Sequence, residues 1–162
     1  MERTHRVVIG VMGASQCDAP AYEMARQVGA LIAERGAILL CGGGGGVMEA
    51  AARGAKEAGG LTIGVMPGMN ASESPPNPYI DVAIFTGLRD GRNWVNVCAS
   101  DAIIAISGGY GTLSEIALAL KVGKPVVLLR SWELPQVDSA LLCVAQTPEQ
   151  AVQLAFQRIR GS

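Results

Sequence analysis

The chain has 162 residues, the usual size of one domain, and its 49% hydrophobic and 17% charged residues exclude intrinsic disorder. Its apolar runs stop well short of the roughly 18–20 residues that a membrane helix needs, so we expect no membrane partner. The net charge of −1, without a run of Lys and Arg, argues against nucleic-acid binding.

The N-terminus and the cysteines indicate where the protein works. Residues 1–6 form a short charged segment, expected to be a flexible tail, and they lack the apolar region and the cleavage site of a signal peptide. The four cysteines lie far apart and form no CxxC pair, and the one histidine, His5, lies in the tail. We therefore expect a cytoplasmic protein with reduced thiols, no metal site and no histidine-based catalysis.

Strand and helix patterns alternate along the chain. Strands are expected where apolar and β-branched residues run together, and helices where apolar residues recur at three- and four-residue steps. In chain order, the expected elements are strand 7–12, helix 20–35, strand 37–41, helix 47–58, strand 61–66, strand 81–85, helix 88–100, strand 102–106, helix 112–122, strand 126–129, strand 141–144 and helix 148–160. A capping box at residues 147–150, with proline at the first helical position, marks the start of the last helix.

This alternation predicts an α/β fold. We expect a doubly wound, mostly parallel sheet of the Rossmann type, flanked by helices and forming a single domain over residues 1–162. In such folds, ligands bind in the crevice at the carboxyl ends of the strands. Residues 67–78, which hold four of the eight prolines, are expected to form a surface loop that can act as a lid.

Two glycine-rich loops, residues 42–46 and 107–111, each follow a buried strand and open a helix. Backbone N–H groups and the positive end of a helix favour a phosphate group at such a place. Together with the turn after the first strand, these loops supply the candidate ligand-binding residues Gly13, Ala14, Ser15, Gly43, Gly44, Gly45, Gly46, Ser107, Gly108, Gly109, Tyr110 and Gly111. The alternative interpretation is that the glycines only permit close packing of helix against strand.

Two common nucleotide motifs do not match. The dinucleotide fingerprint G-x-G-x-x-G needs a glycine where Val47 or Met48 stands, and no acidic residue ends the third strand. The pair Gly123-Lys124 is followed by Pro125 instead of the Ser or Thr of a Walker loop. We therefore expect neither NAD binding nor ATP hydrolysis by a P-loop.

The second loop and the helix after it resemble a known family. Residues 107–115 read SGGYGTLSE and are similar to the PGGxGTxxE signature of the LOG family, whose cytokinin-activating phosphoribohydrolases cleave the bond between a base and ribose 5′-monophosphate. The resemblance implies that Thr112 and the glycines beside it hold the phosphate. It also implies that Arg92 and Glu115 face the sugar and would be the catalytic residues of an enzyme.

Two positions depart from the family pattern. Ser107 replaces the proline of the signature, and Asn93 replaces the lysine that follows the arginine, so the positive pair of the hydrolase is only half present. The pattern is more similar to the molybdenum cofactor carrier branch of the superfamily, which holds a phosphorylated pterin. The resemblance implies a carrier that requires no cofactor, binds a phosphorylated nucleotide- or molybdopterin-type ligand and forms a homodimer or a larger symmetric oligomer.

Several alternatives stay open. Glu115 can serve only as the last residue of a capping box with Thr112, and Arg92 can be a solvated helix residue. The chain can also be a phosphoribohydrolase, or a subunit that uses the fold only for assembly. Lysine decarboxylation, an activity often attached to such sequences, is not expected, because pyridoxal phosphate needs a lysine in the site. The three lysines lie away from both loops, at Lys56, Lys121 and Lys124.

Overall fold

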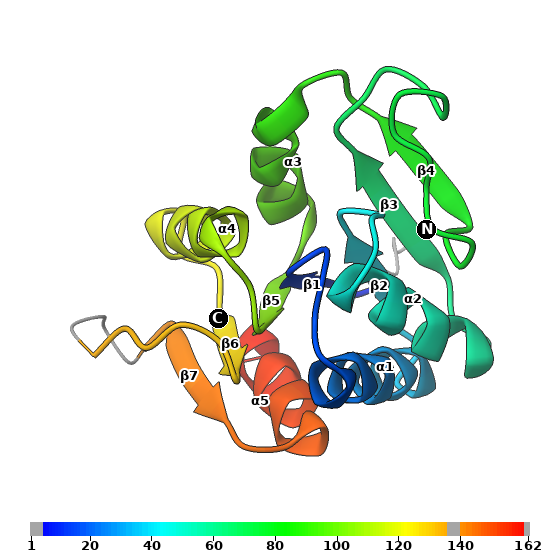
Figure 1. Cartoon of the computed structure of the whole chain (residues 1–162). Helices are drawn as coiled ribbons and strands as arrows, with labels where there is room; N and C mark the ends of the chain where they lie inside the picture. The colour runs from blue at the N-terminus through cyan, green and yellow to red at the C-terminus, as the bar shows by residue number, and fades with distance from the viewer. Residues whose placement is uncertain (1–4, 136–139, 161–162) are drawn as a thin grey trace.

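A computed structural model describes residues 5–135 and 140–160 of the chain. Residues 1–4 of the expected tail lie outside the described residues. Seven strands form one sheet with helices on both faces (Figure 1). The strands are β1 Val8–Gly13, β2 Ile38–Cys41, β3 Thr62–Met66, β4 Val82–Phe85, β5 Ala102–Ile106, β6 Val126–Leu129 and β7 Leu142–Ala145. The helices are α1 Ala19–Glu34, α2 Val47–Glu57, the 3₁₀ turn η1 Arg89–Gly91, α3 Arg92–Ala99, α4 Tyr110–Lys121 and α5 Pro148–Arg160.

The strands lie in the order β4-β3-β2-β1-β5-β6-β7, and every pair of neighbours is parallel. The predicted Rossmann-type α/β class is therefore confirmed, and the sheet is parallel throughout. Gly13 at the end of β1 is paired with Ile106 at the end of β5. Between these two strands the order of the chain reverses, which is the place where doubly wound folds open a crevice for ligands.

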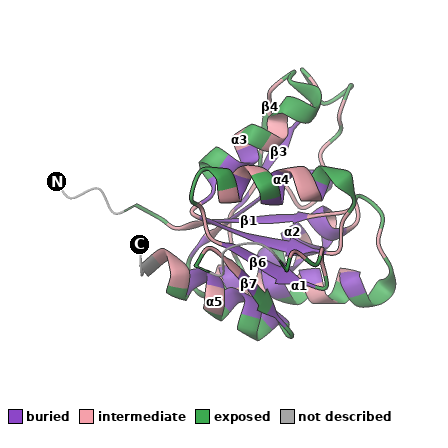
Figure 2. Ribbon diagram, turned by 90° about the vertical axis from the view of Figure 1, so that its left-hand side faces the viewer, coloured by how far each residue is buried: buried purple, intermediate pink, exposed green. Residues whose placement is uncertain are grey.

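The alternating sides of each strand supply two hydrophobic cores. In β5, Ile104 and Ile106 pack with the core under α1, α2 and α5, whereas Ile103 and Ala105 pack with the core under α3 and α4. All five residues of β5 are buried, as a continuous apolar run predicts for the centre of a parallel sheet (Figure 2). The sheet is packed against helices on both faces, so the loops at its carboxyl edge extend from well-packed strands.

Two helices begin more than one residue away from the expected position. The helix expected at residues 88–100 is divided, because Gly91 donates its N–H to Leu88 and closes a 3₁₀ turn before α3 begins. The helix expected from residue 112 begins at Tyr110, two residues earlier. The last helix begins at Pro148 as expected, with the Thr147 hydroxyl accepting the N–H of Gln150.

The remaining contacts fix the outer parts of the chain. His5 and Arg6, the described part of the expected tail, contact the body through Asp101 and the carbonyl of Gly36. Among residues 5–135 and 140–160, no helix combines the length and the apolar character that crossing a bilayer requires.

Candidate functional site

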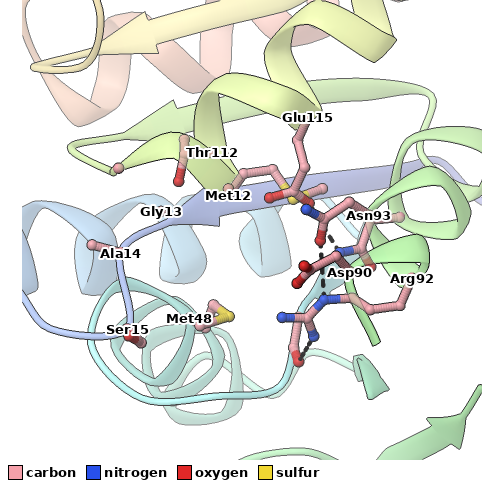
Figure 3. Close-up of a pocket in the computed structure, with 14 residues that line it drawn as sticks. Met12, Gly13, Ala14, Ser15, Met48, Asp90, Arg92, Asn93, Thr112 and Glu115 are labelled. Carbon is pink, nitrogen blue, oxygen red and sulfur yellow. Dashed lines mark hydrogen bonds between the residues drawn. The ribbon is translucent and has the colours of Figure 1, made fainter. Parts of the chain in front are cut away.

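A cavity of about 310 Å³ opens at the carboxyl ends of β1 and β2, between the N-terminal ends of α3 and α4 (Figure 3). Its volume is at the lower end of the range typical of small-molecule sites. The residues that line it are Met12, Gly13, Ala14, Ser15, Gly42, Met48, Asp90, Arg92, Asn93, Asn96, Gly109, Gly111, Thr112 and Glu115. The sequence had singled out nine of these for the site, and the fold brings the nine together from three separate segments.

The first turn of α4 forms one wall of the cavity. Its cap, Gly109, has no side chain, so no side-chain hydrogen bond covers the N–H groups of the first turn. A Cβ built on Gly109 or on Gly111 would meet nothing within 4 Å. The wall is therefore open to a ligand, and the positive end of α4 favours an anion there.

Gly108 has a different role from the two glycines after it. Its φ of 109° lies in the region that favours glycine, and a Cβ there would collide with the side chain of Thr112. Gly108 does not line the cavity. It allows the loop to turn tightly enough that Thr112, which is only 3% exposed, faces the cavity from α4.

Arg92 begins α3 and is held in place by three hydrogen bonds. Its Nη1 donates to the carbonyls of Gly42 at 2.6 Å and Val65 at 2.9 Å, and its Nε donates to Asn93 Oδ1 at 3.1 Å. Within the described part of the chain, Nη2 has no hydrogen-bond partner, and Figure 3 shows this end of the guanidinium directed at the cavity. The arginine is therefore not a solvated helix residue but an oriented cation with one nitrogen left for a ligand.

Asn93 connects this arginine to the opposite wall. Its Oδ1 accepts from Arg92, and its Nδ2 donates to Ser114 Oγ at 3.1 Å, while that hydroxyl donates to the carbonyl of Gly111 at 2.6 Å. The side chain thus joins α3 to the first turn of α4. An asparagine can do this because its amide offers both an acceptor and donors, whereas a lysine offers only donors.

Glu115 lies on the floor of the cavity and is 7% exposed. Its Oε2 accepts a hydrogen bond of 3.0 Å from Nδ2 of Asn96, which is 1% exposed. Burial raises the pKa of Glu115 to about 7, although the Asn96 hydrogen bond and the charge of Arg92 both oppose that rise. The alternative that Glu115 serves only as a capping residue does not fit the structure, because α4 begins at Tyr110 and the carboxyl contacts Asn96 on the neighbouring helix.

Five lining residues were not predicted: Met12, Gly42, Met48, Asp90 and Asn96. Met12 and Met48 bring thioether side chains to the cavity, and Asp90 brings a carboxylate from η1 (Figure 3). The side chain of Asp90 has no hydrogen-bond or ion-pair partner among the residues described. Its place two residues before Arg92 is the sequence signal that could have pointed to it, and no local pattern marks Asn96 within its helix.

The first glycine run, Gly43 to Gly46, lies beside the cavity and does not line it. Asn77 donates to the carbonyls of Gly43 and Gly44, and a Cβ on Gly43 would collide with Met66. Gly45 and Gly46 pass close to the backbone of Ser15, and the carbonyl of Ala14 accepts from the first N–H of α2. Packing uses all four glycines, and a ligand contact for them stays a prediction.

Ser107 and Tyr110 also lie outside the cavity. Ser107 has a φ of 53°, and its carbonyl accepts from the hydroxyl of Ser131. Tyr110 is 84% exposed and stacks on Trp132 at 6.0 Å between ring centres, while Trp132 Nε1 donates to the carbonyl of Gly109. These residues support the loop from behind, and a direct ligand contact for them stays a prediction.

The lysines do not reach the cavity. Lys56 forms an ion pair with Asp81 at 2.8 Å, and Lys124 donates to the carbonyl of Cys98. Lys121 is exposed near the end of α4. No lysine lines the cavity, so it offers no amine for a Schiff base with pyridoxal phosphate.

The parallel sheet, the crevice at its reversal point and the open helix end define a Rossmann-like protein with a candidate small-molecule site. Residues 6–157 match the model of the SLOG cluster4 family. The chain belongs to this family, and the predicted placement in the LOG superfamily near the molybdenum cofactor carrier branch is confirmed.

Relatives of two kinds are similar to the chain. The molybdenum cofactor binding protein of Rippkaea orientalis is 42% identical, with a TM-score of 0.89 over 96% of this chain and 99% of that one. The Moco carrier protein of Chlamydomonas reinhardtii is 39% identical, with a TM-score of 0.87 over 98% and 100%. The cytokinin riboside 5′-monophosphate phosphoribohydrolase of Mycobacterium tuberculosis is 37% identical over 74% of this chain and 67% of that protein.

Proposed function

We propose that this protein binds a phosphorylated, pterin-type small molecule such as molybdopterin and carries it without transforming it. The observation that carries the proposal is the likeness, over nearly the full length of both chains, to the molybdenum cofactor binding and carrier proteins of Rippkaea orientalis and Chlamydomonas reinhardtii. The proposal requires no further cofactor, because the ligand is the cargo.

The cavity supports the phosphate part of this proposal. A phosphate at the open end of α4 would accept from backbone N–H groups near Gly109 and Gly111, from the Thr112 hydroxyl and from Arg92 Nη2. All of these groups line one continuous cavity, and Arg92 is already oriented by its other hydrogen bonds. Little reorganisation is then needed when the anion arrives.

Asp90 supports a pterin over an adenine. A carboxylate carries only acceptors, and the 2-amino-4-oxo edge of a pterin presents two adjacent N–H donors that match its two oxygens. The adenine edge presents one amino donor beside a ring acceptor, so it matches a carboxylate poorly. Asp90 lines the same cavity as Arg92, with no partner among the residues described, and its carboxylate faces inward (Figure 3).

Guanine has the same 2-amino-4-oxo edge, so nucleotides can test this proposal. In calorimetric titrations, GMP should bind about tenfold more tightly than AMP. A hydrogen bond to a charged group is worth about 1.5–3 kcal/mol, and the exposure of Asp90 to solvent places the expected gain at the low end of that range. IMP, which lacks the 2-amino group, should lie between them. Asp90→Asn should remove the preference and leave AMP binding unchanged.

The native ligand can be tested directly. Mass spectrometry of the protein purified from its own source should find a phosphorylated pterin or its oxidation products. Protein with Gly111→Val, which closes the wall at α4, should release none. A purified protein that holds no pterin and binds none of the three nucleotides would overturn the proposal.

The second candidate function is a phosphoribohydrolase, and a specific observation favours it. Arg92 and Glu115 both line the cavity, as the resemblance to the cytokinin-activating enzymes implies for catalytic residues. Asn93 in place of a lysine argues against it, since loss of one charged hydrogen bond to the transition state costs about 1.5–3 kcal/mol, or one to two powers of ten in rate. Chromatographic detection of adenine released from AMP decides the matter, and rapid turnover by the unmodified protein would establish the hydrolase.

A further inference from the structure

Asn96 of α3 and Glu115 of α4 form a buried pair with one unsatisfied atom. Asn96 Nδ2 donates to Glu115 Oε2, but Asn96 Oδ1 has no hydrogen-bond partner. It is the one buried side-chain oxygen or nitrogen in this state within residues 5–135 and 140–160. Buried acceptors without a partner are rare and unfavourable in folded proteins, so this atom calls for a physical explanation.

The missing donor has to come from a group already beside the amide. Oδ1 is sealed from solvent, so neither water nor a ligand in the cavity reaches it unless the pair moves. The carboxyl of Glu115 is the side chain that contacts this amide from α4. An ionised carboxylate has only acceptors, whereas a carboxylic acid has an O–H donor as well.

A neutral Glu115 satisfies both atoms of the amide. Its carbonyl oxygen accepts from Asn96 Nδ2, and its O–H donates to Asn96 Oδ1. The same result follows if the amide is turned over, because its oxygen then faces Glu115 Oε2 and that contact also needs a proton. An ionised Glu115 leaves one amide atom unpaired in either orientation.

Burial favours the neutral form of Glu115, whereas the charge of Arg92 opposes it. The titratable groups that face Glu115 are Arg92 on α3, Asp90 on η1 and Cys41 behind the cavity on β2. Burial raises the pKa of Cys41 to about 11, so this thiol is neutral, and Arg92 is tied to two backbone carbonyls. Burial also raises the pKa of Glu115 to about 7, which leaves it divided between its two forms at neutral pH.

We propose that binding of a phosphorylated ligand in this cavity is coupled to the uptake of one proton by Glu115, and that Asn96 is the positioning residue that holds the resulting acid. The inference rests on the proposed function, because the negative charge of a bound phosphate, next to the carboxylate of Glu115, drives the uptake of the proton. The proton passes from solvent to a carboxylate oxygen of Glu115, and no covalent bond other than that O–H changes. A neutral Glu115 lowers the repulsion that an incoming dianion meets.

Proton uptake can be measured with GMP by calorimetry in buffers that differ in ionisation enthalpy. Above pH 7.5 the phosphate of GMP is fully ionised, since its second pKa is about 6, so its own titration does not interfere. Between pH 7.5 and 8.5, the uptake should approach one proton per GMP bound. Over the same range, the affinity for GMP should decrease by up to about tenfold for each unit of pH. The control is Glu149→Gln, which removes an exposed carboxylate from the first turn of α5 and should change neither the proton uptake nor the pH dependence of affinity.

Two variants in the pair separate its roles. Glu115→Gln is permanently neutral and can still exchange two hydrogen bonds with Asn96, so it should lose both the proton uptake and the pH dependence of GMP affinity. Asn96→Ala removes the hydrogen bond from Nδ2, which favours the ionised form, but it also removes the unpaired acceptor Oδ1 and admits water beside the carboxyl. Because the last two changes both favour ionisation, the midpoint of the pH profile should fall. A midpoint that stays or rises would show that Asn96 does not hold the acid.

The outcome for the unmodified protein distinguishes this inference from the proposed function. If GMP binds with the same affinity from pH 6 to 8.5 and takes up no proton, the inference is wrong and the carrier proposal stands. If neither GMP nor a pterin binds at any pH in this range, the proposed function fails. Circular dichroism of each variant confirms that the compared proteins are folded.

Discussion

Asn93 stands where the hydrolases of the family are expected to have a lysine, and in this structure it orients an arginine instead. Because Asn93 Oδ1 accepts from Arg92 Nε, a lysine at this position would add a cation and remove the acceptor that fixes the first one. The asparagine therefore belongs to a different arrangement, in which, by our proposal, one oriented arginine and the end of α4 would hold the anion. This arrangement suits binding better than bond cleavage.

The open glycines of α4 lead to the first prediction. Gly109→Val and Gly111→Val should each lower the affinity for GMP at least a hundredfold, because the new side chain would occupy the wall that the phosphate approaches. The fold should be kept, since neither Cβ meets any atom within 4 Å. Calorimetric titration measures the loss, and Ala117→Val on the exposed side of the same helix is the matched control. Unchanged affinity in both folded variants would remove α4 from the site.

Glu115 should make the stability of the unbound protein depend on pH. Its pKa is about 7 in the folded chain and about 4.5 when unfolded, so the folded state binds the proton more strongly. The stabilising contribution is then complete below about pH 4.5 and is lost as pH rises through 7. The free energy of unfolding should fall by about 3 kcal/mol across this window, an order-of-magnitude value from 1.36 kcal/mol per pKa unit.

Urea titrations at pH 5 and pH 8 measure this change, with Glu115→Gln as the reference that lacks the titrating group. The unmodified protein should lose more stability than the variant between the two values. Equal losses of stability in both proteins would mean that folding does not raise the pKa of Glu115.

The candidate site could be predicted only in part from the sequence. Arg92, Thr112 and Glu115 were found because they belong to a recognisable local pattern. Asn96 could not be found, because its partner is 19 residues away and only the packing of α3 against α4 buries the pair. Asp90 lies in a 3₁₀ turn that was expected to be regular helix, so the direction of its side chain could not be inferred.

The helix ends show the same limit at the scale of elements. The sequence T-x-x-E at residues 112–115 has the spacing of a capping box, yet α4 begins at Tyr110, where Leu113 donates to the carbonyl of Gly109. A capping pattern inside a helix is indistinguishable from one at its start when glycines precede it, because glycine permits either conformation. With α4 beginning at Tyr110, Glu115 lies inside the helix, where it contacts Asn96 of α3 and lines the cavity.

Asp18 caps the N-terminal end of α1, a role that had not been predicted from the sequence. The Asp18 side chain accepts the N–H of Ala21 at 2.9 Å, and Pro20 follows in the first turn. Asp18→Ala should lower stability by about 1 kcal/mol and the melting temperature by about 2–4 °C. Scanning calorimetry measures the shift. Asp18→Asn, which keeps an acceptor, should lose much less, and an equal loss in both variants would show that the cap is not responsible.

For the whole molecule, the order of strands and helices was predictable because the parallel strands are short, mostly apolar runs between glycine or polar turns. Such runs need cover on both faces, which only alternating helices supply. The reversal between β1 and β5 then fixes where the loops meet. The sequence therefore placed the candidate site at the edge of the sheet where the structure has a cavity.

A homodimer or a larger symmetric oligomer is the fourth prediction, at the scale of the molecule. Closed two-fold symmetry is the commonest arrangement of soluble oligomers, and Trp94 on α3 is 44% exposed beside the site. Light scattering at micromolar concentration should give at least twice the chain mass of 16.8 kDa. Trp94→Glu should lower the measured mass, whereas a mass of one chain for the unmodified protein would refute the prediction.

The stacking of Tyr110 on Trp132 behind the glycine loop gives the protein a built-in optical reporter. The indole donates to the carbonyl of Gly109, the residue that caps α4, so any shift of that loop alters the polarity around the ring. The chain has only two tryptophans, and Trp94→Phe would leave Trp132 as the single emitter. Loading of the cavity would then be readable from intrinsic fluorescence during rapid mixing, without a label, and the lifetime of the loaded state would become a measurable property.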